Sequence, residues 1–495
     1  MKPLSRMLSG TVLLAGLTVL SCADNHAVRI RYQAEKLFFE ADRLMQNARI
    51  RPELNDPRAL ATVRNAYDEL VRFCMTAIDS VSPSANPIEY REMASLTHRS
   101  SIRLCQLYFA THRYDSCAEV IARLVAKVPL ETQEAAGAQV LMGQALQASG
   151  TLDSAFACYR RGVDLLNPPL DGKGEIVFNV FNVPAHLVSL YAQLGDSLKA
   201  DEAFAQASGY YGAIASGKYG ARPALASSAM LARLNTDRGN WNAAIAALEK
   251  LVDSSGVLNR DAKLRIADLR AAELGDFDMA IRYYDELLAD LKGRDTMMKP
   301  VLFFKKSLVL LEMKQYETAR QLLVQIQTYY PGYFATDPLP QYTKARSFES
   351  EGNWNRAETE YKYLIDNYPP SEQTFSTLLY LADQYTKMGR TIESDKLLEQ
   401  ARQTYDQAAV QGAGTPLEAL ALMYKSELLR RQQQWRPSAE ALVAVSDRFP
   451  GTEFGRNALI TAVNVYRQKL NDPATADSLV RAYVTKMTRL DEDRI

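Results

Sequence analysis

Histidine is scarce in this sequence, and its four copies do not form a metal site. They are His26, His98, His112 and His186 among 495 residues, and none has a second histidine or a cysteine at the spacing of metal ligands. Motifs for a nucleophile elbow, a phosphate-cradling loop and a dinucleotide site are missing as well, and the glycine-rich residues 171–174 lack the flanking strand and helix of a phosphate site. We therefore expect no catalytic residues, no cofactor and no metal.

An excess of charge of one sign is also absent. Lysine and arginine total 58, and aspartate and glutamate total 58. No global basic field would concentrate the protein on nucleic acid, which is not an expected partner. Hydrophobic residues make up 47% of the chain, which is enough to form a buried core. The chain is longer than one compact core supports. Several domains or a stack of repeats are expected.

No apolar run is long enough to cross a membrane. Residues 7–20 are too few for a spanning helix, and they follow the basic residues Lys2 and Arg6 and precede Ser21 and Cys22. This is the pattern of a secretory signal, so residues 1–21 are predicted to be a signal peptide that the mature protein lacks.

The end of this segment, Val-Leu-Ser-Cys at residues 19–22, resembles the lipobox of bacterial lipoproteins. The resemblance implies cleavage before Cys22, lipidation of its sulfur and a membrane tether over residues 22–28. An ordinary secretory signal with a different cleavage site is the alternative. Ala23 takes the place of the aspartate that marks inner-membrane retention in the enterobacterial scheme, which favours the outer membrane of the cell envelope and leaves the periplasmic or surface orientation open.

A phrase recurs along the rest of the chain: an apolar helix, a Gly-Asp or Gly-Asn turn, an aromatic residue and, three residues later, an alanine. Gly239-Asn240-Trp241 before Ala244 is one clear copy. The small residue on the second helix of each copy serves as a marker, and successive markers lie 36 to 45 residues apart. The markers are Cys117, Ala155, Ala200, Ala244, Ala280, Ala319, Ala357, Ser394, Ser438 and Ala476.

This period resembles the tetratricopeptide repeat (TPR), a pair of antiparallel helices of about 34 residues. The resemblance covers about residues 95–490 and implies an all-α, right-handed superhelical solenoid of about ten helix hairpins over residues 90–490. Twelve residues before each marker, a small residue on the first helix should contact the second helix. Val188, Asp268 and Asn464 depart from this pattern.

Residues 29–80 carry no clear copy of the phrase, yet they contain two apolar stripes at helical spacing. One stripe includes Ala34, Leu37 and Ala41, and the other includes Tyr67 and Leu70. Pro57 suits the first position of the second helix. We expect a divergent N-terminal helix hairpin here.

Three intervals between markers are long, which predicts extra loops at residues 167–184, 209–223 and 405–416. Residues 175–183 alternate enough to suggest an extended arm or edge strand. The second loop combines aromatic and basic groups that suit a glycan or an extended peptide, although tyrosines in such places more often pack over a helix end. Its candidate partner-binding residues are Tyr210, Tyr211, Tyr219 and Arg222.

The first helices should form a concave wall of mixed charge. A solvated face is the ordinary alternative for any one residue on it. The clamp of paired lysines and asparagines with which relatives of this repeat bind chaperone tails is not found. Candidate partner-binding residues on this wall are Met230, Arg233, Arg265, Tyr342, Arg346, Tyr380, Asp383, Tyr424, Glu427 and Arg430.

Two cysteines occupy facing small positions of one hairpin. Cys105 on the first helix and Cys117 on the second should bring their Cα atoms near the distance of a disulfide, which an oxidising compartment would permit. The alternative is that both are small buried residues, as Cys74 and Cys158 suggest.

The anchor and repeats together resemble the TPR lipoproteins of bacterial envelopes, such as the barrel-assembly lipoprotein and the Tol-Pal coordinator. The resemblance implies a non-enzymatic, membrane-tethered scaffold that binds envelope proteins or their peptide segments. A rival is a glycan- or nutrient-binding lipoprotein that partners an outer-membrane transporter, although such proteins carry larger insertions. A purely structural protein that assembles through its end hairpins is a third hypothesis.

Overall fold

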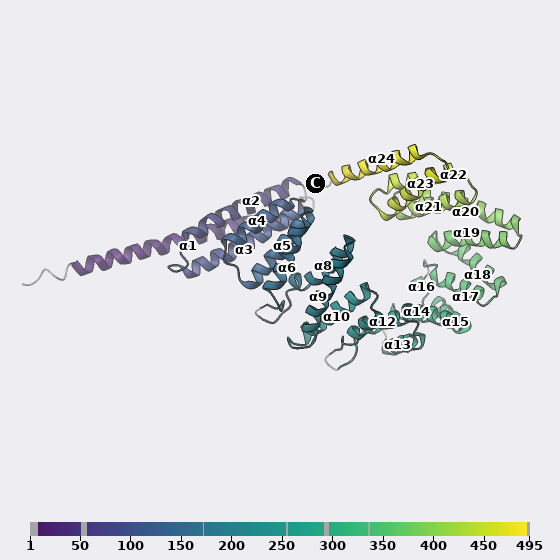
Figure 1. The fold of residues 1–495 in the computed structure, drawn as a ribbon, viewed down its shortest axis with the longest axis horizontal. Helices are drawn as coiled ribbons and strands as arrows, with labels where there is room; N and C mark the ends of the chain where they lie inside the picture. Colours follow the sequence, from purple (N-terminus) through teal and green to yellow (C-terminus); the bar gives the residue numbers. More distant parts are fainter. Residues whose placement is uncertain are drawn as a thin grey trace, which may run out of the picture. The chain divides into compact units, whose positions relative to one another are not determined.

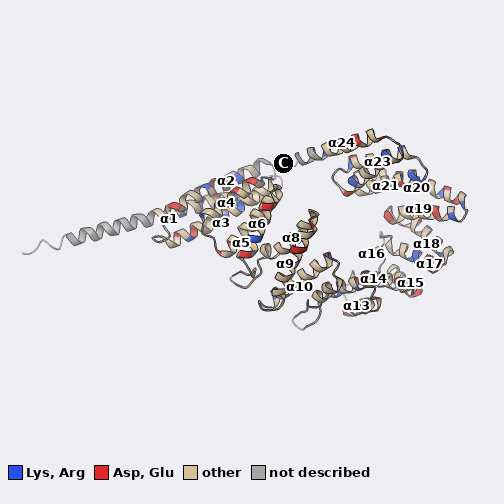
Figure 2. Ribbon diagram, viewed as in Figure 1, with Lys and Arg blue, Asp and Glu red and all other residues tan. Residues whose placement is uncertain are grey.

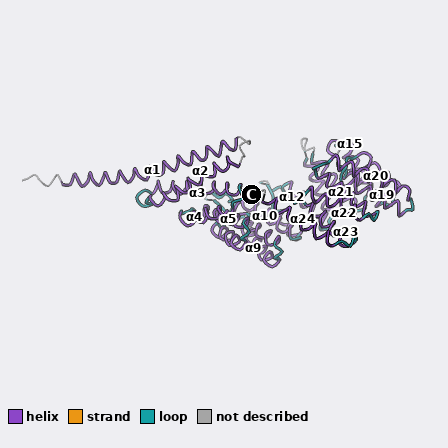
Figure 3. Tube along the Cα trace, turned by 90° about the horizontal axis from the view of Figure 1, so that it is seen from above, coloured by secondary structure: helices purple, strands orange, loops and turns teal. Residues whose placement is uncertain are grey.

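The structure is a computed structural model that describes residues 8–50, 57–171, 173–253, 256–291, 297–334 and 337–492. Every regular element in these ranges is a helix (Figure 3). Extended backbone pairs there only at two isolated bridges, Leu170 with Ile176 and Val252 with Leu258. None of the described helices is both long and apolar enough to span a bilayer. The predicted all-α class is confirmed.

The chain divides into two compact units, residues 1–250 and 251–495. In the first unit, helices that follow one another in the chain pack side by side (Figure 1). Its helices are α1 (Leu8–Ile50), α2 (Pro57–Ala77), the 3₁₀ helix η2 (Ile78–Ser80), α3 (Pro87–Ala110), α4 (Tyr114–Lys127), α5 (Thr132–Ala148), α6 (Leu152–Leu165), α7 (Phe178–Phe181), α8 (Val183–Gln193), α9 (Ser197–Ala215), α10 (Ala221–Asp237) and α11 (Trp241–Leu248).

The second unit repeats the same arrangement of consecutive hairpins, and basic and acidic residues are interspersed along the helices of both units (Figure 2). Its helices are α12 (Arg260–Ala272), α13 (Phe277–Asp290), α14 (Met298–Glu312), α15 (Tyr316–Tyr329), α16 (Pro331–Phe334), α17 (Leu339–Ser350), α18 (Trp354–Asn367), α19 (Glu372–Lys387), α20 (Thr391–Gln411), α21 (Pro416–Arg431), α22 (Trp435–Arg448), α23 (Glu453–Gln468) and α24 (Pro473–Glu492).

The small marker residues hold the hairpins together. All ten markers lie on second helices and are at most 3% exposed. Their first-helix partners include Ala345 and Ala382, which are equally buried, and Ser426, whose hydroxyl lies 2.8 Å from that of Ser438. Because small side chains meet at these positions, the two helix backbones approach closely. The predicted repeat is confirmed.

Asp268 and Asn464, which depart from the pattern of small residues, are not the contact residues of their hairpins. The prediction is wrong there because the turn of each hairpin is longer. Most hairpin turns close with a hydrogen bond from a backbone N–H to the carbonyl five residues earlier, as from Asn353 to Phe348. The turns after α12 and α23 close over six residues, from Asp276 to Arg270 and from Asp472 to Tyr466. The extra residue moves the contact position back by one, to the buried Ala267 and Val463.

The first hairpin is formed by α1 and α2, with α3 packed against both. Ala34, Ala41 and Met45 of α1 are buried, as are Tyr67 and Leu70 of α2, so the predicted apolar stripes are confirmed. Helix α2 begins at Pro57, as expected. Helix α1 includes the residues of the predicted tether and much of the predicted signal peptide. The side chain of Cys22 lies outside those that the structure describes, so its lipidation remains a prediction.

The prediction of long loops is wrong at residues 209–223 and 405–416, because the second helix of each hairpin is longer there instead. Helix α9 continues through Tyr210 and Tyr211, and α20 continues through Tyr405. The third segment, residues 167–184, does not form an extended arm either. One bridge closes a turn around Asp171, and the chain then enters the short helix α7. The extended arm or edge strand predicted from the alternation of apolar residues is therefore wrong. Residues 178–181 form a single helical turn that buries one face.

Candidate functional site

The first helices of unit 1 line a groove of mixed polar and apolar residues that runs over α5, between α3 on one side and α7 and α8 on the other. Two adjoining hollows of about 520 and 510 Å³ form it, and they share Val140, Gln144 and Asn179 in their linings. Residues at helical spacing face the groove, such as His98, Ile102, Gln106 and Phe109 on α3. The register of each first helix therefore presents one mixed polar and apolar stripe.

Amide side chains supply most of the polar groups of this groove. Gln106, Gln133, Gln144 and Asn182 are exposed and make no side-chain hydrogen bond within the described part of the chain. Each primary amide offers both donors and an acceptor. Asn179 lies against α5 because Gly137 has no side chain there: a Cβ would stand 3.3 Å from the Asn179 Nδ2 atom. The groove therefore presents unused donors and acceptors from three elements.

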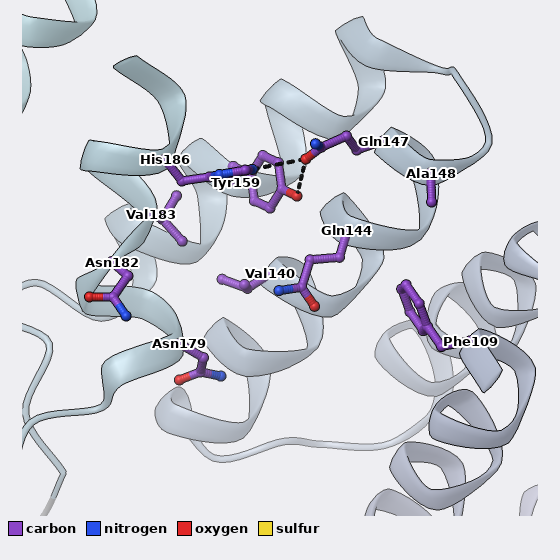
Figure 4. Close-up of a pocket in the computed structure, with 10 residues that line it drawn as sticks. All are labelled: Phe109, Val140, Gln144, Gln147, Ala148, Tyr159, Asn179, Asn182, Val183 and His186. Carbon is purple, nitrogen blue, oxygen red and sulfur yellow. Dashed lines mark hydrogen bonds between the residues drawn. The ribbon is translucent and has the colours of Figure 1, made fainter. Parts of the chain in front are cut away.

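One end of the groove holds a fixed hydrogen-bonding cluster (Figure 4). The Gln147 Oε1 atom accepts a 2.7 Å hydrogen bond from the Tyr159 hydroxyl and lies 2.9 Å from the His186 Nε2 atom. Partial burial lowers the pKa of His186, although much of the residue is exposed, and burial also raises the pKa of Tyr159 to about 12. Both groups are therefore neutral at physiological pH, and Gln147 is already occupied.

The other end carries the charges of the groove. The His98 Nδ1 atom lies 3.1 Å from the Glu134 carboxylate, which also accepts from the backbone of Glu131 in a capping box. Burial lowers the pKa of His98 and outweighs the opposing effect of Glu134. Neither hollow has a lysine or arginine among its described lining residues. The arrangement suits a neutral polar ligand such as a peptide backbone and offers a carboxylate no cationic partner among these residues.

In unit 2 the predicted wall residues fall into two groups. The first surrounds Tyr361, whose ring centroid lies 5.9 Å from that of Tyr342 and 5.5 Å from that of Tyr380. The hydroxyls of Tyr361 and Tyr380 both donate to Glu349, and burial raises the pKa of each tyrosine. Arg346, on the same helix as Tyr342, is exposed and has no ion pair among the described residues.

The second group lies at a hollow of about 500 Å³ between α19, α21, α22 and α23. Tyr424 and Arg430 line it, together with Glu427, which forms an ion pair with Arg430. Asp383 forms an ion pair with Arg431 and is not among the described residues that line the hollow. The structure thus brings Tyr424 and Arg430 together at this hollow, while Tyr342, Tyr380 and Tyr424 all pack against the same core cluster.

The remaining predicted wall residues stand alone. Arg233 of α10 is exposed and lies 3.8 Å from Asp237, one turn later on its own helix. Met230, also on α10, is partly buried against a core cluster. Arg265 of α12 is exposed, without an ion pair in the part of the chain that the structure describes. None of the three lines the hollows described above.

The predicted aromatic loop is not a single loop: Tyr210 and Tyr211 lie on α9, and Tyr210 lines a hollow of about 440 Å³ there. Tyr211 is fully buried, and its hydroxyl donates to the Phe181 carbonyl, so its assignment to a binding loop is wrong. Tyr210 is half-buried beside it on α9. Tyr219 lies in the turn before α10, where the Lys218 ammonium stands over its ring, and Arg222 forms an ion pair with Glu175.

Cys105 and Cys117 face each other, as their positions predict. Both are buried free thiols in the structure, and the Cys105 Sγ atom lies 3.7 Å from the Cys117 carbonyl oxygen. A hydrogen bond with Cys117, together with burial, raises the pKa of Cys105, which disfavours the reactive thiolate. A disulfide between them in an oxidising compartment remains a prediction.

The groove amides were missed at the sequence level, although a signal for them exists. Gln106 and Gln144 follow the contact residues Cys105 and Gly143 directly, just as Arg346 and Asp383 follow theirs. The position after each contact residue turns away from the second helix, which exposes it. Asn179 and Asn182 had no such signal because their segment was expected to be extended.

Comparison with known proteins agrees with the hairpins. The family model of the tetratricopeptide repeat matches residues 341–371, which contain most of α17 and all of α18. A search of curated protein sequences found no match.

Three solved structures illustrate the similarity at the level of structure. A tetratricopeptide repeat protein from Parabacteroides merdae is 16% identical, with a TM-score of 0.32, over 57% of this chain and 99% of its own. The apo quorum sensor NprR from B. thuringiensis is 12% identical, with a TM-score of 0.34, over 72% and 100%. Yeast Tom70 is 12% identical, with a TM-score of 0.35, over 94% and 97%. These similarities are too distant to carry over a function.

The matched repeat has the same construction as the neighbouring hairpins of its unit: a buried small residue on each helix and a tight turn between them. The chain is a protein that contains tetratricopeptide repeats.

Proposed function

We propose that this chain is a membrane-tethered scaffold of the bacterial cell envelope that binds extended segments of other proteins in the groove over α5. The unpaired amides of Gln106, Gln144 and Asn182 carry this proposal. A peptide in extended form presents N–H and C=O groups along its length, and primary amides can satisfy both kinds of group. Binding to backbone groups would make the site tolerant of sequence.

Apolar groups beside the amides supply affinity. Ile102, Leu141 and Phe109 line the groove next to Gln106 and Gln144, so a bound segment would bury apolar side chains while its backbone pairs with the amides. Since the lining lacks lysine and arginine, internal segments suit the site better than acidic tails or terminal carboxylates.

The tether assigns the partners to the envelope. A lipid on Cys22 would hold the chain at a membrane, most simply the outer membrane, so that the groove meets proteins of that compartment. In this proposal the chain holds its partners, since the described lining of the groove combines neutral histidines with amides.

A crosslinking experiment in intact cells tests the scaffold. A photoreactive amino acid is placed at Gln144, in the groove, or at the exposed Gln325 on the second helix α15 as a control. We expect defined envelope proteins to crosslink at position 144, not at 325, and to be lost when Cys22→Ser removes the anchor. Capture of glycan without protein at position 144 would favour the ligand-binding alternative instead.

Affinity for a captured segment then tests the amides. Each neutral hydrogen bond contributes about 0.5–1.5 kcal/mol, so the double variant Gln106→Ala/Gln144→Ala should bind a synthetic copy of that segment about 5- to 150-fold more weakly. The Gln325→Ala control should bind it as the wild type does. Equal affinity of the double variant would rule out recognition by these amides.

A further inference from the structure

Helix α1 presents an exposed apolar stripe on the side opposite its packed face. Val28, Tyr32 and Phe39 are 41%, 68% and 66% exposed. Their spacing of four and seven residues places them on one side of the helix. Ala27, Ala34, Ala41 and Met45 are buried on the other side, where α2 and α3 pack. The stripe is therefore a regular face of the helix that nothing in the described chain covers.

A line of cations runs beside this stripe. Arg29, Lys36 and Arg43 follow one another at seven-residue spacing, are exposed and form no ion pair among the described residues. Glu40 lies on the same flank, so this flank has three positive charges and one negative charge, an excess of two positive charges.

The carboxylates of the other flank are engaged within the protein. Glu35 lies 3.4 Å from Arg31, and Asp42 accepts hydrogen bonds from Gln46 and Tyr67. The charge that α1 leaves unpaired beside its aromatic residues is therefore positive on balance.

We propose that α1 lies flat on an anionic lipid surface, with Val28, Tyr32 and Phe39 at the level of the headgroups and Arg29, Lys36 and Arg43 against lipid phosphates. Aromatic side chains with a polar handle favour the membrane interface, and basic residues on the flank of such a stripe bind anionic lipids. This inference rests on the tether of the proposed function, because the lipid on Cys22 would bring α1 to a bilayer.

Distance from the anchor decides the orientation. At about 1.5 Å per residue, Val28 lies about 9 Å along the helix from Cys22 and Phe39 about 25 Å. Only a helix that lies along the surface brings all three apolar side chains to the headgroups. The anchor and the stripe would then fix the orientation of the first hairpin, which a single flexible tether leaves free.

The test removes the lipid so that α1 alone can bind. The mature chain, expressed from residue 22 without the predicted signal peptide and carrying Cys22→Ser, is sedimented with vesicles of phosphatidylethanolamine and phosphatidylglycerol, or with vesicles of phosphatidylcholine. We expect binding to the anionic vesicles and weaker binding to the neutral ones. In this background, Tyr32→Ser/Phe39→Ser should weaken binding about ten-fold, since two half-buried aromatic rings contribute at least the roughly 1.4 kcal/mol of that factor.

Charge is tested separately. The triple variant Arg29→Gln/Lys36→Gln/Arg43→Gln should lower binding at least about ten-fold, because each cation near an anionic surface contributes about a five-fold factor. Matched controls carry Tyr363→Ser/Ile460→Ser, at exposed apolar positions of unit 2, or Arg161→Gln/Lys387→Gln/Lys396→Gln, at exposed basic positions. Both controls should bind as the Cys22→Ser parent does.

Insertion gives a second readout. Phe39→Trp should gain fluorescence quenching by brominated lipid beyond that of the native tryptophans. The proposal is overturned if the Cys22→Ser chain ignores anionic vesicles, if the aromatic variant binds unchanged, or if a photocrosslinker at Phe39 captures protein in cells and no lipid. The scaffold function would survive each of these outcomes, because its own test is the crosslinking at Gln144.

Discussion

The Tyr211 hydroxyl donates a 2.6 Å hydrogen bond to the Phe181 carbonyl, thirty residues earlier. The same relationship recurs in unit 2, where the Tyr405 hydroxyl donates 2.8 Å to the Phe375 carbonyl, again thirty residues earlier. In both cases the two rings meet edge to face, at 5.2 and 5.0 Å between centroids. A lengthened second helix thus ties back to the start of its own hairpin through a buried tyrosine.

Removing either hydroxyl should destabilise its unit. Tyr211→Phe or Tyr405→Phe keeps the ring and leaves a buried carbonyl short of a donor, so we expect the free energy of unfolding to fall by about 1–2 kcal/mol in each case. Urea denaturation followed by circular dichroism measures the change. Tyr363, which is 51% exposed, serves as the control, and Tyr363→Phe should change the free energy by less than about 0.5 kcal/mol. Equal effects at all three sites would refute the structural role of the two bonds.

Gly143 should not tolerate even one added methyl group. A Cβ at this position would lie 2.8 Å from the Tyr159 ring and 3.2 Å from the Ala155 carbonyl oxygen, at the closest approach of α5 and α6. We expect Gly143→Ala to lower the free energy of unfolding by about 1–3 kcal/mol, despite the higher helix propensity of alanine. Gly209, inside α9, has open space around its Cβ position, so Gly209→Ala should gain about 0.5–1 kcal/mol. A loss at Gly209 as large as that at Gly143 would show that crowding is not the cause.

The hairpin turns offer sites for stabilisation. Each of the ten turns in the described repeats holds one residue with positive φ, glycine in six of them. Lys314 and Gln433 adopt φ of 61° and 57°, which costs a residue with a Cβ about 1–2 kcal/mol. Glycine relieves this strain but makes the unfolded chain more flexible, which offsets part of the gain. Lys314→Gly and Gln433→Gly should therefore each raise the free energy of unfolding by about 0.5–1 kcal/mol, as measured in denaturant titrations. Gly352→Ala, at φ 86°, should lose stability, and a gain there would contradict the argument.

The repeat itself could be predicted from sequence because its signal is local. A buried small residue such as Ala357 and its partner Ala345 must recur at nearly fixed spacing, whatever the other residues do. The two misplaced contacts, Asp268 and Asn464, show the limit of this rule: one extra turn residue shifts the register without changing the pattern around it.

The binding surface was harder to predict, since it depends on what each helix leaves uncovered. Tyr211 and Gln144 illustrate this. The aromatic Tyr211 attracted attention yet is fully buried, whereas Gln144 looked ordinary yet faces the groove without a partner. Aromatic and charged residues are easily recognised in a sequence as candidate binding residues, but the packing of neighbouring hairpins determines which of them are accessible.

Glu358 connects consecutive hairpins of unit 2 through charge. Its carboxylate accepts hydrogen bonds from Arg390, at 2.9 and 3.2 Å, from Lys362 and from Tyr385, and its side chain is 13% exposed. The hydrogen bonds from Arg390, before all other causes, lower the pKa of Glu358 from 4.5 to about 2. The ionised carboxylate is therefore much better stabilised in the folded protein than in the unfolded chain.

The stability that Glu358 provides should disappear at acid pH. Because its pKa is lower in the folded state, the unfolded chain takes up the proton first as the pH falls below about 4.5, and the contribution is lost by about pH 2. At pH 7, Glu358→Gln should lower the free energy of unfolding by an amount on the order of 2–3 kcal/mol, and the gap to wild type should narrow between pH 4.5 and 2. Denaturant titrations across this range measure it. Glu399, paired with Arg402 in solvent, also has its pKa lowered to about 2, yet Glu399→Gln should have little effect because water screens the pair. If the gap for Glu358→Gln were independent of pH, packing of the side chain rather than its charge would account for the stabilisation.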